Sequence, residues 1–153
     1  MTKKNWVLIF AAVVLAAVYI FYFTDLFRPK ILVIHHVSRD LRPGRRPPGA
    51  AQSPTVPVTF GLEQNYTITE LEVVPLAAWQ TNPNTLPLWH LVSSSNSVPV
   101  KMFVYGQNIR GMQPSVPGTH ADELQPGVTY RLFVTAGSIK GQHDFQPVAR
   151  SGG

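Results

Sequence analysis

The chain contains no cysteine. This absence excludes disulfide bonds, thiolate catalysis, cysteine-ligated zinc and iron–sulfur clusters, but leaves open whether the protein works in the cytosol or the periplasm. The 153 residues also lack a Gly-x-Ser-x-Gly elbow, a His-Glu-x-x-His metal motif and a glycine-rich phosphate loop. We therefore expect a protein that is not an enzyme, with no catalytic residues, no bound metal and no cofactor.

The remaining candidates for chemistry are isolated pairs. His35 and His36 are neighbours in a predicted strand, where successive side chains point to opposite faces, so they cannot share one site. Glu70 and Glu72 would share a strand face, and paired carboxylates can carry out acid–base catalysis. Two exposed strand acids are far commoner than a catalytic pair, so we interpret them as surface residues.

Charge, glycine and proline are all absent from residues 7–23, which are apolar or aromatic throughout. With Trp6 before the run and Leu26 and Phe27 after it, a helix over 6–27 would extend roughly 33 Å, enough to cross a hydrocarbon core of about 30 Å. Trp6, Tyr19 and Tyr22 lie near its ends, where amphipathic rings favour the headgroup region. We predict a transmembrane helix at about 6–27 within a membrane anchor of residues 1–27.

A cleaved signal peptide is the alternative, since Lys3 and Lys4 precede the apolar run. The run is longer than a signal h-region, however, and ends in Tyr19–Asp25 without a small-x-small cleavage site. We therefore expect a single-pass protein of the bacterial inner membrane. Ala12 and Ala16 stand four residues apart, a spacing that lets membrane helices pack closely, although alanine also faces lipid.

The net charge of +5 is concentrated just after the anchor. Residues 28–46 carry six basic side chains against one acidic, whereas residues 47–153 carry five basic against six acidic. Such a near-neutral domain does not favour nucleic-acid binding. A basic juxtamembrane band can bind anionic headgroups or acidic loops of a neighbouring subunit, or be a solvated linker. The candidate partner- or lipid-binding residues are Arg28, Lys30, Arg39, Arg42, Arg45 and Arg46.

Two sets of sequence features favour opposite sides of the membrane for the C-terminal domain. Basic residues near the helix ends slightly favour a cytoplasmic C-terminal domain. Small anchored sandwiches are commoner outside, and Lys3 and Lys4 adjoin the helix as in a signal anchor. We favour the periplasmic side and keep the cytoplasmic side open.

The rest of the chain predicts strands and turns. Residues 28–57 form a juxtamembrane segment, with a strand at 31–37 and a linker at 39–57 rich in Pro, Gly and Arg. Further strands are expected at 58–62, 66–74, 86–92, 100–105, 129–135 and 144–148, with turns at 80–87, 93–98, 111–118 and 136–141. A long loop at 107–123 is expected to end in a helical turn at 121–124. This pattern predicts an all-β sandwich over 58–150.

Residues 124–137, Leu-Gln-Pro-Gly-Val-Thr-Tyr-Arg-Leu-Phe-Val-Thr-Ala-Gly, resemble the entry to the penultimate strand of fibronectin type III and related immunoglobulin-like domains. The resemblance implies that Tyr130 forms a tyrosine corner, its hydroxyl bonded to backbone slightly upstream. Trp89 is similar to the core tryptophan of these families, although theirs usually lies on an earlier strand. The resemblance implies an immunoglobulin-like fold and little about function, because such sandwiches have many roles.

We therefore expect a non-catalytic accessory or scaffold subunit that packs against the integral membrane subunits of a larger complex. Respiratory and photosynthetic complexes often carry single-helix subunits, and one helix followed by a β domain resembles, in outline only, the H subunit of bacterial reaction centres. The alternative is an independent cell-envelope protein whose sandwich loops bind a ligand or partner.

Replacing Ala16 with Arg tests the anchor. A charge at the centre of a membrane helix costs about 2.5–3.5 kcal/mol on insertion scales, so the variant should no longer insert stably. Fractionation of membranes checks this. An Ala16→Arg protein that still sediments with membranes and resists alkaline extraction would disprove the spanning assignment.

Overall fold

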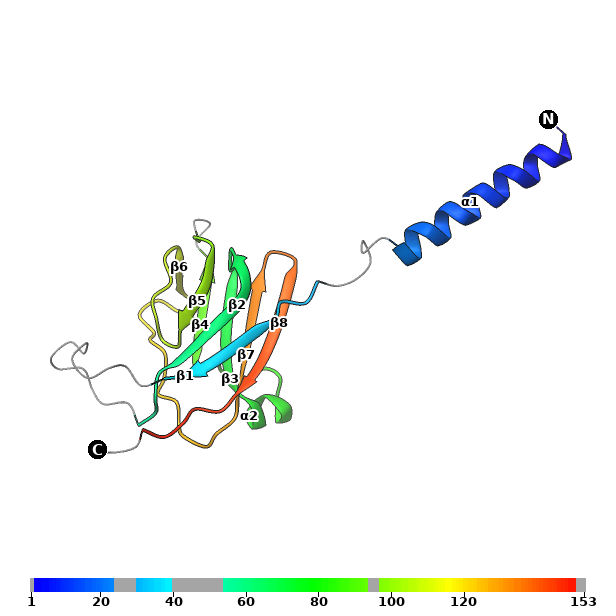
Figure 1. The fold of residues 1–153 in the computed structure, drawn as a ribbon. Helices are drawn as coiled ribbons and strands as arrows, with labels where there is room; N and C mark the ends of the chain where they lie inside the picture. Colours follow the sequence, from blue (N-terminus) through cyan, green and yellow to red (C-terminus); the bar gives the residue numbers. More distant parts are fainter. Residues whose placement is uncertain (1, 24–29, 40–53, 94–96, 151–153) are drawn as a thin grey trace. The chain divides into compact units, whose positions relative to one another are not determined.

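The chain divides into two compact units, Met1–Lys30 and Ile31–Gly153, in a computed structural model that describes residues 2–23, 30–39, 54–93 and 97–150. The first unit contains helix α1 (Lys3–Phe23) and the second a β domain (Figure 1). Within α1, Lys3–Tyr22 has a mean hydropathy of 2.2 and is long and apolar enough to cross a membrane. The helix begins earlier than expected, and residues 24–27 of the predicted span lie outside the described residues.

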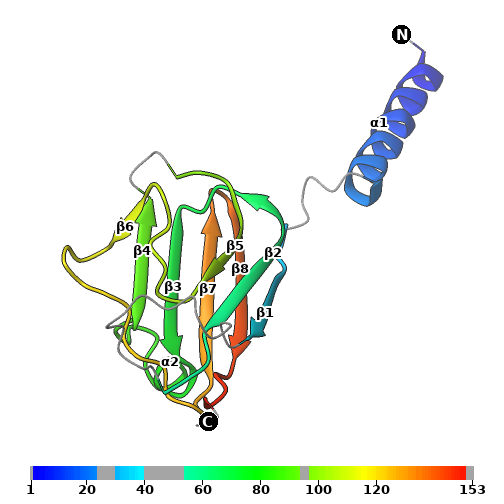
Figure 2. The same cartoon turned by 60° about the vertical axis from the view of Figure 1, so that its left-hand side comes forward.

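The β domain consists of two antiparallel sheets of unequal size that face each other (Figure 2). The smaller has the order β1-β2-β5 and the larger the order β6-β4-β3-β7-β8. The chain thus consists of an N-terminal apolar helix followed by a domain of antiparallel β-sheets. The strands are β1 (Ile34–Ser38), β2 (Val58–Tyr66), β3 (Glu70–Pro75), β4 (Trp89–Ser93), β5 (Val100–Val104), β6 (Met112–Pro114), β7 (Tyr130–Ala136) and β8 (Ile139–Phe145), and helix α2 spans Leu76–Thr81.

Aromatic side chains from both sheets meet in the core. Phe60 of β2 packs edge-on against Phe145 of β8, with ring centroids 4.9 Å apart, and lies 5.5 Å from the ring of Phe103 of β5. All three rings are at most 2% exposed. Because strand side chains alternate between faces, the inward residues of neighbouring strands meet in this core.

Tyr130 and Trp89 both lie in the core, with 3% and 5% of their surface exposed. The backbone N–H of Gln125 donates to the Tyr130 hydroxyl over 2.9 Å, which ties the chain before β7 to the start of that strand. This is the upstream backbone bond that the 124–137 motif predicts. Trp89 belongs to β4, where its ring contacts Tyr105 at a centroid distance of 5.1 Å.

Four local expectations differ from the structure. The last strand is β8 at 139–145 rather than 144–148, so the turn after β7 is much tighter than the predicted turn at 136–141. The predicted long loop contains β6, and residues 121–124 are not helical. Helix α2 was not predicted, because six residues are too few to show a helical period. Finally, β1 pairs with β2 through five residue pairs, so the first strand is part of the sandwich rather than of a separate juxtamembrane segment.

The chain enters the β domain through a close approach between two backbones. Ile31 forms a parallel bridge with Lys140, and the N–H of Leu32 donates to the Lys140 carbonyl over 3.2 Å. A Cβ atom at Gly141 would collide with the Leu32 carbonyl oxygen and lie 2.9 Å from the Leu32 Cβ. Gly141 is therefore required at this position of β8.

Gly141→Ala should consequently destabilise the β domain by about 1–3 kcal/mol, the usual cost of overpacking. Gly61→Ala is the matched control, because a Cβ at Gly61 meets no atom within 4 Å. Urea denaturation of the detergent-solubilised chain, followed by tryptophan fluorescence, measures both. Equal stability of the two variants would show that the Leu32–Gly141 approach is not a packing constraint.

Candidate functional site

The residues proposed to bind a partner or lipid are only partly described. Lys30 and Arg39 are exposed, at the two ends of the segment that contains β1. Arg28, Arg42, Arg45 and Arg46 lie outside the described residues. Ala12 and Ala16 are exposed on α1, where their shared helix face is available for contact. Arg39 follows β1 directly in the second compact unit, whereas Lys30 belongs to the first.

Two neighbouring rungs on the outer face of the smaller sheet form what we call the bare face. One rung is His35, Gly61 and Met102, and the other is Val37, Thr59 and Val104. Met102 is 67% and Val37 is 50% exposed. No Asp, Glu, Lys or Arg stands on either rung, and the next charged positions along these strands are exposed Glu63 on β2 and exposed Arg39 after β1. Gly61 stands in the middle of its rung between the His35 and Met102 positions, and a Cβ atom there would meet no atom within 4 Å.

The outer face of the larger sheet is different, because polar groups and α2 lie on it. His90 Nε2 is 2.9 Å from Glu70 Oε1. Burial raises the pKa of neighbouring Glu72, with a smaller opposing effect from His90. Farther along the face, Arg131 forms a two-point contact with Asp144 at 2.6 and 2.8 Å, and its guanidinium lies 4.8 Å from the ring centroid of Trp79 in α2.

These groups make a fixed polar surface. The hydrogen bond to Arg131 lowers the pKa of Asp144, and the same bond raises the pKa of Arg131, so the pair stays charged. The expected Glu70–Glu72 face thus exists, with His90 beside it. Within the described ranges, no group of three or more His, Asp or Glu side chains is arranged to hold a metal ion.

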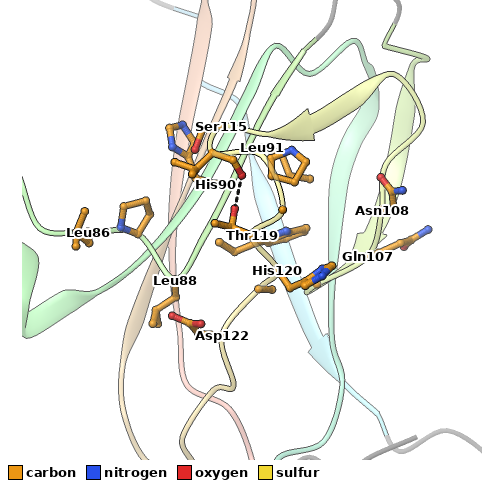
Figure 3. A pocket seen from close by; sticks show the side chains of 17 residues that line it. Leu86, Leu88, His90, Leu91, Gln107, Asn108, Ser115, Thr119, His120 and Asp122 are labelled. Atoms are coloured by element: carbon orange, nitrogen blue, oxygen red, sulfur yellow. Dashed lines mark hydrogen bonds between the residues drawn. The ribbon is translucent and has the colours of Figure 1, made fainter.

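A pocket, which we call the loop pocket, lies beside β4 under the connection between β5 and β7 (Figure 3). Its volume of about 780 Å³ falls in the range of small-molecule sites, about 300–1,000 Å³. Leu86 and Leu88 line one side, and Gln107 and Asn108 lie on the opposite side. The lining also includes the His120 imidazole, the Thr119 hydroxyl and the Asp122 carboxylate, so polar groups surround a partly apolar pocket.

Backbone hydrogen bonds attach the loop over this pocket to β4. Ser115 N–H donates to the His90 carbonyl over 3.1 Å, and Asp122 N–H donates to the Leu88 carbonyl over 2.9 Å. The Tyr105 hydroxyl donates to the Asp122 carbonyl over 2.8 Å. Burial, with a further contribution from Asp122, raises the pKa of Tyr105 well above its usual value, so this hydroxyl keeps its proton as a donor.

The pairing of two histidines was missed from the sequence. His36 of β1 and His143 of β8 face each other across the sandwich, with Nδ1 of His36 2.7 Å from Nε2 of His143. The alternation argument correctly separates His35 from His36, since His36 faces inward and His35 outward. It could not reveal the partner, because the last strand was predicted to begin at 144 and so excluded His143.

Comparison with known proteins gives no further information on the site. No protein-family model matches the chain, and no curated protein or solved structure is significantly similar to it.

Tyr105→Phe should loosen the loop over the pocket. The variant loses one hydrogen bond, which is worth about 0.5–1.5 kcal/mol, and leaves the Asp122 carbonyl without this donor. Hydrogen exchange of the amides in 115–122 should accelerate while that of β3 stays unchanged. Tyr66→Phe is the control, since the Tyr66 hydroxyl has no hydrogen-bond partner within the described part of the chain. Unchanged exchange in 115–122 would show that Tyr105 does not restrain the loop.

Proposed function

We propose that this protein is a non-catalytic accessory or scaffold subunit. In this proposal α1 anchors the chain in the membrane, and the bare face of the β domain packs on an apolar surface of an integral membrane protein. The observation that supports the proposal is the exposure of Val37 and Met102 on two neighbouring rungs that carry no Asp, Glu, Lys or Arg. Fully burying one such side chain contributes about 1.5–3 kcal/mol.

The chemistry of the bare face favours a protein over a lipid headgroup or a nucleic acid as its partner. Phosphate groups are bound by Arg, Lys and backbone N–H groups, and neither rung carries Arg or Lys. The absence of a side chain at Gly61 leaves open space for a side chain from an opposing surface. In this proposal exposed Lys30 and Arg39 would meet acidic groups of the partner, where each basic residue next to an anionic surface contributes about 1 kcal/mol.

We further propose that the sandwich is of the immunoglobulin or fibronectin type III kind. The strand orders β1-β2-β5 and β4-β3-β7-β8 correspond to A-B-E and C′-C-F-G in those folds, and Tyr130 stands at the start of the strand corresponding to F. Two features depart from the pattern. β6 joins the edge of β4 although it follows β5 in the chain, and Trp89 lies on β4.

The loop pocket supports a second candidate, a cell-envelope protein that binds a small ligand through its loops. Its volume and its mixed apolar and polar lining are typical of ligand sites. In this case the protein would work without a stable protein partner, and the bare face would be an ordinary exposed sheet surface.

A pair of matched variants separates the two candidates. Met102→Glu places a charge on the bare face, and Leu86→Glu places one at the rim of the loop pocket, where Leu86 is 86% exposed. Neither change disturbs the core. The protein is extracted from its native membrane in mild detergent, and the size of the particle that contains it is measured.

We expect the wild type and Leu86→Glu to co-migrate with a large complex. Met102→Glu should lose at least about tenfold in retention, because a buried unpaired charge costs more than the roughly 1.4 kcal/mol that this factor represents. A wild-type protein that migrates as a free monomer would refute the accessory role. Retention of Met102→Glu at the wild-type level would refute the use of the bare face.

A further inference from the structure

The seam between the two sheets is closed by the histidine pair. β1 and β8 are edge strands of the smaller and the larger sheet respectively, so each has one side without a neighbour in its own sheet. The inward side chains of His36 and His143 meet there, with ring centroids 4.9 Å apart and a ring nitrogen of each 2.7 Å apart. At the other end of this seam stand the Ile31–Lys140 bridge and the Leu32–Lys140 bond.

We propose that His36 and His143 form a pH-sensitive latch, which holds β1 against β8 while at least one of the two rings is neutral and releases it when both are protonated. This inference concerns regulation and does not rest on the accessory role proposed above. It follows from the hydrogen-bonding capacity of imidazole. A neutral ring has one N–H donor and one acceptor, whereas a protonated ring has two donors and no acceptor.

The pair therefore responds to two protons in different ways. With no added proton, one ring donates and the other accepts. With one added proton, the charged ring donates to the neutral one, and the bond persists as a charge-assisted bond. With a second proton, no acceptor remains between the two nitrogens, and two positive charges face each other at hydrogen-bond distance. Like charges this close in a partly buried site repel each other strongly.

Within the described part of the chain, no carboxylate is hydrogen-bonded to either ring, and Asp144 acts on His143 only from the neighbouring strand position. β2 places Phe60 beside His36, β7 places Leu132 beside His143, and Phe145 lies 6.1 Å from the His36 ring. The adjacent strand residues His35 and Asp144 point to the opposite faces of their sheets, and Asp144 is already bonded to Arg131. Lys140, farther along β8, adds positive charge.

The direction of the pH dependence follows from His143. Burial, with further contributions from His36 and His35, lowers the pKa of His143 below its ordinary value of 6.5, against an opposing effect of Asp144. The folded state therefore binds this proton less readily than the unfolded state does. The stability contributed by the latch is complete above about pH 6.5 and is lost as the pH falls through the lowered pKa.

Hydrogen exchange of the full chain in detergent micelles at pH 7.5 and 5.0 tests the latch, with rates corrected for intrinsic exchange and EDTA present. In the wild type, we expect protection of β1 and β8 to fall at least about tenfold relative to β3 at the lower pH. His143→Gln keeps a donor and an acceptor but cannot gain a charge, so its β1 protection should not change with pH. His120→Gln, which alters an exposed loop histidine, should behave as the wild type does.

Two results would overturn the proposal. One is wild-type β1 protection that is the same at both pH values, and the other is an equal loss of protection in His143→Gln. If His143→Gln does not fold, the wild type alone decides through a titration of its histidine ring resonances. The latch requires that His143 takes up its proton below its ordinary pKa of 6.5, and a His143 ring that titrates at 6.5 or above would exclude it.

Discussion

The unequal width of the two sheets is the constraint on which the β domain depends. Three strands cannot cover the inner faces of five. β1 and β2 cover the β8 end of the larger sheet, and β5 covers its middle through the contact of Phe103 with Trp89, whose ring centroids are 6.3 Å apart. The inner side of β4 and β6 beyond this contact must be covered by something other than a strand, since exposed apolar surface there would be costly.

The connection between β5 and β7 provides this cover. Ile109 and Leu124 are buried in the common core, and Ala121 and Tyr105 pack against it. A covering loop fits less closely than a strand does, and the loop pocket lies where the connection leaves β4 at Ser115 and returns at Asp122. The same inequality acts at the other end of the domain, where two sheet edges face each other and are joined by the histidine pair and a single backbone bridge instead of a strand ladder. The loop pocket and the histidine pair thus both result from the difference in width between the three-stranded and the five-stranded sheet.

A feature of this structure can be predicted from the sequence when the residues that form it are close together in the chain. α1 and most strands are visible because hydrophobic runs and alternation are local, and Tyr130 is visible because its motif covers seven residues. Helix α2 and the bounds of β8 cannot be predicted in this way. Helix α2 is only six residues long, and β8 contains Gly141, Gln142 and His143 where an alternation of apolar residues would be needed. The basic band and the Ala12–Ala16 pair can be named from sequence. The bare face, the loop pocket and the histidine pair depend on register between strands distant in the chain, which no local pattern reveals.

The Ile31–Lys140 bridge has a mechanical consequence. It precedes β1 in the chain, so tension that enters the β domain from the N-terminal side reaches this bridge and the Leu32–Lys140 bond before it reaches the β1–β2 ladder. A parallel pairing loaded along its strands is sheared rather than unzipped, and its resistance depends on how many bonds share the load. Here the parallel pairing is a single bridge, backed by the close fit of Leu32 on Gly141. A membrane-tethered β domain built in this way would first give way to pulling at its own entry point, while the five-stranded sheet remained intact.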